Sequence, residues 1–266
     1  METDMTIKAN DGHFIVTAIT TKDQISLLVN NIAKTIDKSS GAMYADINIS
    51  KIDEFGAFSI KGREAALTRL NLKLSGITSL ILSGCTGLKE LVCNANNLIE
   101  LDLADCPALK TLYCSANQLT ELDLSVCAEL ETLLCSGNRF AELDVFFCPE
   151  LRELNCGANY LTSLDLSGCP KLSRLDCAEN QLTELDLSDC TKMFVLDCSE
   201  NQLTELDLLN CTKIWELYCS ANQLTELDLS KCKILDKLQC FDNQLTIVIL
   251  SGNCSMLRYK EDYFPV

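Results

Sequence analysis

The sequence predicts a β-rich solenoid, a stack of short coils held together by a parallel sheet, and three observations support this. The eight residues NQLTELDL occur four times unchanged, at 117–124, 180–187, 201–208 and 222–229. The separations between these copies are multiples of 21 residues. One such unit has a ridge of inward leucines that it cannot cover alone, so neighbouring units must stack to bury it. A phrase repeated at a fixed period indicates repeated geometry, whereas a catalytic site is needed only once.

The repeat has a continuous register from residue 67 to residue 255. The pattern L-x-x-L-x-C-x-x-N-x-L-x-x-L-D-L-x-x-C-x-x recurs every 21 residues without internal insertion. Side chains alternate along a strand, so positions 4 and 6 point inward and positions 3, 5 and 7 point outward. A coil of 21 residues leaves no room for a return helix, and we expect positions 15–16 to form a second short extended face. The nine copies begin at Leu67, Leu88, Leu109, Leu130, Leu151, Leu172, Met193, Ile214 and Leu235.

This pattern resembles the leucine-rich repeat family over residues 67–255. The form is similar to the short, cysteine-bearing 21-residue repeat of bacterial surface proteins, including the internalins. The resemblance implies a right-handed superhelix with a parallel concave sheet, on which such proteins usually bind other proteins. It also implies a cell-surface or secreted location, whereas a chain complete as printed would be cytoplasmic, because its N-terminus METDMTIKANDGHF lacks a secretory profile. The chain departs from the usual motif in carrying two cysteines in each repeat.

Repeat position 9 predicts an internal ladder of asparagines. A buried amide beside a turn can satisfy backbone groups of its own coil and of the next coil, so we assign these residues a structural role. The first repeat has Ser75 at this position, and the others have Asn96, Asn117, Asn138, Asn159, Asn180, Asn201, Asn222 and Asn243.

All 17 cysteines lie in the repeats, and three interpretations compete. A zinc site needs clustered ligands, but the cysteine spacing alternates between 8 and 13 residues and His13 is the only histidine. Disulfides between neighbouring coils are within reach, but 17 is odd and pairing would break a uniform ladder. We favour two columns of buried thiols that act as small apolar fillers, and we expect no metal and no cofactor. Related repeats also stack free cysteines, so the resemblance agrees.

The two cysteine columns occupy repeat positions 6 and 19. Position 6 holds Cys93, Cys114, Cys135, Cys156, Cys177, Cys198, Cys219 and Cys240. Position 19 holds Cys85, Cys106, Cys127, Cys148, Cys169, Cys190, Cys211 and Cys232. Cys254 is displaced by one residue.

An outward stripe of carboxylates accounts for most of the net charge of −16. This charge makes nucleic acid and anionic membrane surfaces poor partners, and no apolar run is long enough for membrane insertion. The stripe is a solvated face, a site for calcium or other cations, or a surface for a basic partner. Position 13 supplies Glu100, Glu121, Glu142, Glu184, Glu205 and Glu226, and position 15 supplies Asp102, Asp123, Asp144, Asp165, Asp186, Asp207 and Asp228.

The variable outward positions predict where a partner binds. We expect one apolar patch on the concave face near Tyr113, formed with Val92 and Leu134 of adjacent coils. A second patch surrounds Trp215 and Tyr218, with the acidic pair Asp176 and Asp197 between the two. Phe194, Val195 and Phe241 complete the partner-binding set. Tyr and Trp are common interface anchors, although these side chains could instead pack on their neighbours with no partner. Phe146 and Phe147 form a further candidate contact on the back face.

The ends of the chain do not keep the period and are predicted to act as caps. Residues 1–66 form an N-terminal cap with one amphipathic helix over 22–38, which begins at a capping box, and a strand near 43–50. Residues 256–266 form a C-terminal cap that shields the last coil.

These features favour a non-enzymatic interaction module, adhesin-like or receptor-like, that binds a protein or glycan as a monomer. No catalytic residues are assigned, because the single histidine lies in the cap and the sequence has no Gly-rich phosphate loop. A purely structural spacer and an intracellular effector-type protein-binding domain are the alternatives.

Overall fold

The computed structural model describes residues 3–8, 14–20, 43–46, 57–62, 67–72 and 77–250. These fall into two compact units, one ending at Phe140 and the other beginning at Ala141, and each is described by itself. All elements in this part of the chain are β-strands. None of its segments is a helix long and apolar enough to cross a membrane.

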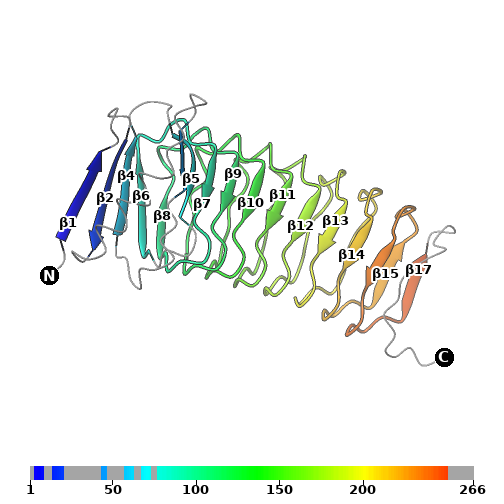
Figure 1. Ribbon diagram of the computed structural model, residues 1–266. Coiled ribbons are helices and arrows are strands. Elements are labelled where there is room, and N and C mark those ends of the chain that lie inside the picture. The colour runs from blue at the N-terminus through cyan, green and yellow to red at the C-terminus, as the bar shows by residue number, and fades with distance from the viewer. Residues whose placement is uncertain are drawn as a thin grey trace. The chain divides into compact units, whose positions relative to one another are not determined.

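The first unit contains two sheets (Figure 1). One sheet has a single short strand from each coil, in the parallel order β3 (Met43–Asp46), β5 (Leu67–Asn71), β7 (Glu90–Val92), β9 (Thr111–Tyr113) and β10 (Thr132–Leu134). The other sheet has the order β1 (Thr3–Lys8), β2 (Phe14–Thr20), β4 (Ala57–Gly62), β6 (Ser79–Ser83) and β8 (Glu100–Asp102). In this second sheet β4, β6 and β8 are parallel, and β1 and β2 are antiparallel.

The second unit repeats the same plan. One strand from each coil forms a parallel sheet of β11 (Glu153–Asn155), β12 (Arg174–Asp176), β13 (Val195–Asp197), β14 (Glu216–Tyr218) and β16 (Lys237–Gln239). A second pair joins β15 (Glu226–Leu229) to β17 (Ile247–Leu250). Partners in both sheets are 21 residues apart, so each repeat forms one coil of a parallel β-solenoid. The predicted second extended face is confirmed where β6, β8, β15 and β17 form.

Two outward surfaces are named from here on. The strand face is the outward side at repeat positions 2, 3, 5 and 7, on and beside the strands of the first kind. The acidic face is the outward side at positions 13 and 15. Between them, the leucines of positions 1, 4, 11, 14 and 16 point inward, and the three-residue strands alternate accordingly, with a buried central leucine between more exposed neighbours.

Both cysteine columns lie in this interior, as predicted. The sixteen cysteines from Cys85 to Cys240 are buried and free. Burial raises the pKa of their thiols, to about 12 for Cys114 and Cys156 in one column and for Cys169 and Cys211 in the other. They therefore fill space in the core as neutral, small apolar groups.

The asparagine ladder is also buried, and it links each coil to its neighbours. Asn180 Nδ2 donates to the backbone oxygen of Cys177 in its own coil and to that of Cys156 in the preceding coil, both at 3.1 Å. Asn180 Oδ1 accepts the backbone N–H of Leu161 at 3.0 Å. The second coil is therefore the preceding one, where the sequence analysis expected the next. The same bonds recur from Asn117 to Asn243.

The residue before each of these asparagines has a left-handed backbone. At repeat position 8, φ lies between 51° and 55° for Ala95, Ala116, Ala158, Glu179, Glu200, Ala221 and Asp242. Gly137 has the same conformation with φ of 64°, and it is the one glycine at this position in the described coils. Left-handed backbone costs a non-glycine residue about 1 to 2 kcal/mol, so the turn is kept at some expense of stability in most coils.

The coil geometry begins before the sequence repeat does. Tyr44 of β3 pairs with Arg69 of β5, and Ala57 of β4 pairs with Ser79 of β6, so the pairing residues are 25 and 22 positions apart. Insertions therefore hide one irregular coil from a search at a period of 21. β3 falls within the segment predicted as a strand, whereas β1, β2 and β4 were not predicted. The helix predicted at 22–38 and the C-terminal cap at 256–266 lie outside the described residues.

Candidate protein-interaction surface

The aspartates of the acidic face have a structural role that the sequence analysis did not identify. Asp186 Oδ1 accepts the backbone N–H of Ser188 at 2.8 Å, and Asp165 Oδ1 accepts that of Ser167 at 2.9 Å. Five more coils make the same bond, from Asp102, Asp123, Asp144, Asp207 and Asp228. Each carboxylate thus closes the turn that follows it. This bond holds the pKa of Asp186 below its usual value, with the Ser188 side chain adding to the effect.

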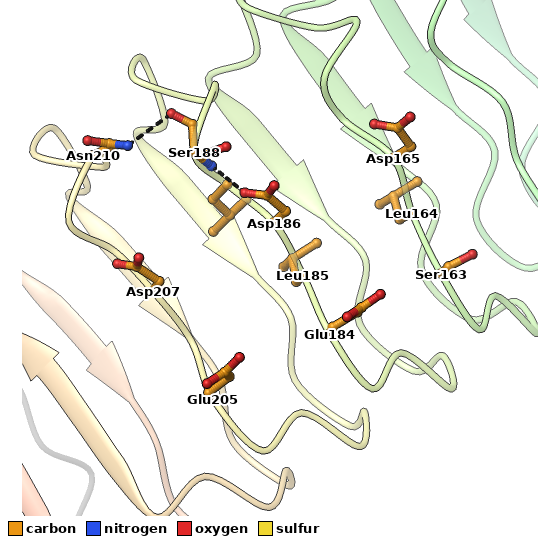
Figure 2. A pocket seen from close by; sticks show the side chains of 11 residues that line it. Ser163, Leu164, Asp165, Glu184, Leu185, Asp186, Ser188, Glu205, Asp207 and Asn210 are labelled. Atoms are coloured by element: carbon orange, nitrogen blue, oxygen red, sulfur yellow. Dashed lines mark hydrogen bonds between the residues drawn. The ribbon is translucent and has the colours of Figure 1, made fainter.

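A shallow groove of about 420 Å³ lies on the acidic face of the second unit (Figure 2). The groove has Leu164 and Leu185 in its floor, with carboxylates of successive coils along it. No group of three or more His, Cys, Asp or Glu side chains among the described residues is arranged to hold a metal ion. The groove is lined by Ser163, Leu164, Asp165, Glu184, Leu185, Asp186, Leu187, Ser188, Glu205, Asp207 and Asn210.

On the strand face of the first unit, the predicted patch is only partly exposed. Val92, Tyr113 and Leu134 do lie side by side, because β7, β9 and β10 pair in register. Val92, however, is only 7% exposed, so the expectation that it is presented to a partner is wrong. Its short side chain lies in the same row between Asn71 and Tyr113. Tyr113 and Leu134 are half-buried.

The strand face of the second unit carries the most exposed aromatic residues of the predicted set. The rings of Phe194 and Trp215 are nearly parallel, with an interplanar angle of 8° and a centroid distance of 6.3 Å. Phe194 is 41% exposed and Trp215 is 37% exposed. Phe241 is also exposed, and Val195 is half-buried between Arg174 and Glu216. Adjacent coils thus present one stacked aromatic pair to solvent.

Asp176 and Asp197 are direct neighbours across β12 and β13. Asp176 accepts the backbone N–H of Ala178 at 3.1 Å and the side-chain amide of Asn155 at 2.9 Å. Asp197 accepts the backbone N–H of Ser199 at 3.0 Å. Burial raises the pKa of Asp176, and the charge of Asp197 raises it further. Both side chains are half-buried.

Tyr218 belongs to a polar network. Its hydroxyl donates to Glu216 Oε2 at 2.9 Å, and Lys237 Nζ contacts Glu216 Oε1 at 2.6 Å. The hydrogen bond and ion pair with Lys237 lower the pKa of Glu216, while burial and then the Glu216 contact raise that of Tyr218. The ring of Tyr218 is therefore held in a fixed orientation beside the aromatic pair's coil.

The structure thus brings together seven of the ten predicted site residues in the second unit and three in the first. The set in the second unit is Asp176, Phe194, Val195, Asp197, Trp215, Tyr218 and Phe241. Sequence reasoning missed Glu216 and Lys237, although opposite charges 21 residues apart are a readable signal for an ion pair between coils. Phe146 and Phe147 are exposed and form an edge-to-face pair with ring centroids 5.4 Å apart, as the expected back-face contact requires.

One-strand coils, an asparagine ladder and two cysteine ladders together define a leucine-rich repeat solenoid. The protein is a leucine-rich repeat protein of the short, cysteine-ladder type. It is similar to the functional domain of InlJ from Listeria monocytogenes, which includes a cysteine ladder, with 29% identity and a TM-score of 0.56 over 80% of this chain and 54% of that chain. The chain therefore spans about half the length of InlJ.

Two further structures share the fold. YopM, a leucine-rich effector protein from Yersinia pestis, has 24% identity and a TM-score of 0.73, over 88% of this chain and 64% of that chain. The plant peptide hormone receptor RGFR1, solved in complex with RGF2, has 21% identity and a TM-score of 0.56, over 71% of this chain and 35% of that chain. No protein-family model and no curated protein matches the sequence.

Proposed function

We propose that the chain is a protein-binding module, receptor-like or adhesin-like, that holds its partner on the strand face of the second unit. One observation carries the proposal: Phe194 and Trp215 form a stacked, solvent-exposed pair beside two carboxylates. Aromatic side chains gathered at one surface are typical of interfaces, where they supply large contact area at small entropic cost. The scaffold positions around them are buried and repeat from coil to coil, so the pair does not serve the core.

The similar structures support this choice of function. RGFR1 is a peptide hormone receptor that was solved with its peptide hormone RGF2. The same fold therefore provides a surface for a protein ligand in at least one solved complex. In this chain the rigid, closely paired strands of the second unit would hold the aromatic pair in a fixed position, which reduces the entropic cost of binding.

The proposal can be tested with a displayed library of random peptides panned against the purified protein. Peptides enriched on the wild type should lose binding to the double variant Phe194→Ala/Trp215→Ala. Phe147→Ala is the matched control, since it removes a similarly exposed aromatic ring from another surface. Binding that depends on Phe147 rather than on Phe194 and Trp215 would refute the proposed site. Circular dichroism and urea unfolding of each variant would verify that the coils remain folded.

A further inference from the structure

The carboxylates of Asp176 and Asp197 lie next to each other without a cationic partner among the described residues. Neither forms an ion pair, and their hydrogen-bond donors are neutral amides. The two nearest cations on the same strands and their neighbour are already engaged, Arg174 with Glu153 at 3.6 Å and Lys237 with Glu216 at 2.6 Å. Two half-buried like charges at one spot repel each other, and a cation brought by a partner would relieve that repulsion.

The aromatic pair borders this acidic spot. Phe194 precedes Asp197 by three residues in the same coil, and Trp215 stacks on Phe194 from the next coil. The backbone N–H of Trp215 donates to the oxygen of Phe194 at 2.8 Å, and that of Asp236 donates to the oxygen of Trp215 at 2.9 Å, which fixes the row. Aromatic faces attract both cations and apolar side chains. An acidic spot and an apolar spot therefore adjoin on one surface.

A buried hydroxyl on the same strand face lacks a partner. Ser220 follows Tyr218 by two residues at an outward repeat position, and it is only 4% exposed. Its Oγ makes no hydrogen bond within the described part of the chain. A buried polar atom without a partner is costly, so a ligand group that enters beside Tyr218 could satisfy it.

We propose that this surface binds a protein segment in which an arginine lies next to an apolar side chain. The guanidinium would bridge Asp176 and Asp197, and the apolar neighbour would pack on Phe194 and Trp215. Arginine fits better than lysine, because its planar group offers five donors that can serve two carboxylates at once. The net charge of −16 also draws a basic partner toward the protein. This inference rests on the proposed function and adds the chemistry of the ligand.

The intrinsic fluorescence of the protein offers a direct readout, because Trp215 is its only tryptophan. Peptides enriched from the displayed library should share an arginine beside an apolar residue. One such peptide, without tryptophan of its own, is synthesised with arginine, lysine or the neutral isostere citrulline at that position. Titration should change the Trp215 emission with the arginine peptide, with about tenfold weaker binding for lysine and more than tenfold for citrulline.

Variants of the protein complete the test. Asp176→Asn and Asp197→Asn should each weaken binding of the arginine peptide about tenfold or more. The fold should tolerate them, because Asn155 in the same row accepts the Gly157 backbone N–H in the same way. Glu184→Gln, the control, removes one charge from the acidic face and should leave binding unchanged.

The outcomes separate the two proposals. Enriched peptides without a basic residue, or full binding by both Asn variants, would overturn the arginine inference, while loss of binding in Phe194→Ala/Trp215→Ala would still support the proposed function. If no enriched peptide depends on Phe194 and Trp215, both proposals fail.

Discussion

Replacing Ala116 with glycine should stabilise the protein, although it removes a methyl group. Ala116 has a φ of 54°, which costs a non-glycine residue about 1 to 2 kcal/mol. Glycine avoids this cost but loses about 0.5 to 1 kcal/mol more conformational entropy on folding. The expected net gain is therefore about 0.5 to 1 kcal/mol.

The reverse change tests the same reasoning one coil later. A Cβ added to Gly137 would meet only Ala116 backbone atoms, at 3.6 and 3.7 Å, which is ordinary contact, so the penalty of Gly137→Ala comes from its φ of 64° alone. It should lose about 1 kcal/mol.

Urea unfolding followed by circular dichroism would measure both changes as shifts of the midpoint at constant slope. The matched control is Ala178→Gly, at a repeat position without left-handed backbone, which should destabilise by about 0.5 to 1 kcal/mol. If Ala116→Gly destabilises as much as Ala178→Gly does, the left-handed turn does not store the strain assigned to it.

Three further predictions concern the ladders and the acidic face. A thiol reagent at about pH 8 should leave the sixteen buried cysteines unmodified in the native protein, because burial raises their pKa values, and should modify all 17 after unfolding; thiols missing from the unfolded, unreduced chain would reveal disulfides. Asn180→Ala strands two carbonyls and one N–H and should cost about 2 to 4 kcal/mol in urea unfolding, whereas Gln181→Ala on the exposed neighbour should be close to neutral; equal losses would argue against the ladder. The pKa of Asp186 is lowered by the Ser188 backbone N–H, so its contribution to stability is present above its unfolded pKa of about 4 and is lost as pH falls through the lower folded pKa. Asp186→Asn keeps the acceptor but cannot titrate, and it should lose less stability than the wild type between about pH 5 and pH 2; identical pH profiles would contradict this.

The periodic part of the fold was predictable because one rule applies in every coil. Cys177, Asn180 and Leu182 are buried in the structure as the 21-residue register predicts. The same rule fails where a feature occurs once. β4 pairs with β6 after an insertion of one residue, and β1 and β2 pair antiparallel, so neither arrangement leaves a trace at the repeat period.

The site was less predictable, because exposure at an outward position depends on neighbouring side chains. Val92 and Trp215 both occupy outward positions, yet Val92 is covered in its row and Trp215 is not. The turn-closing role of Asp186 was missed because an outward carboxylate in an acidic stripe looks the same in sequence whether or not it accepts a backbone N–H. The ion pairs between coils could have been found, since Glu150 and Lys171 also lie 21 residues apart.

The antiparallel hairpin of β1 and β2 determines how the second sheet of the first unit ends. Coils add to a parallel stack by presenting the same strand direction and the same spacing of backbone donors and acceptors at each edge. β2 reverses that direction against β4, so the edge beyond it no longer matches the face that a second copy of the repeats would offer. A protein made of nearly identical coils could otherwise join end to end into fibres, and this reversal terminates such growth on that side.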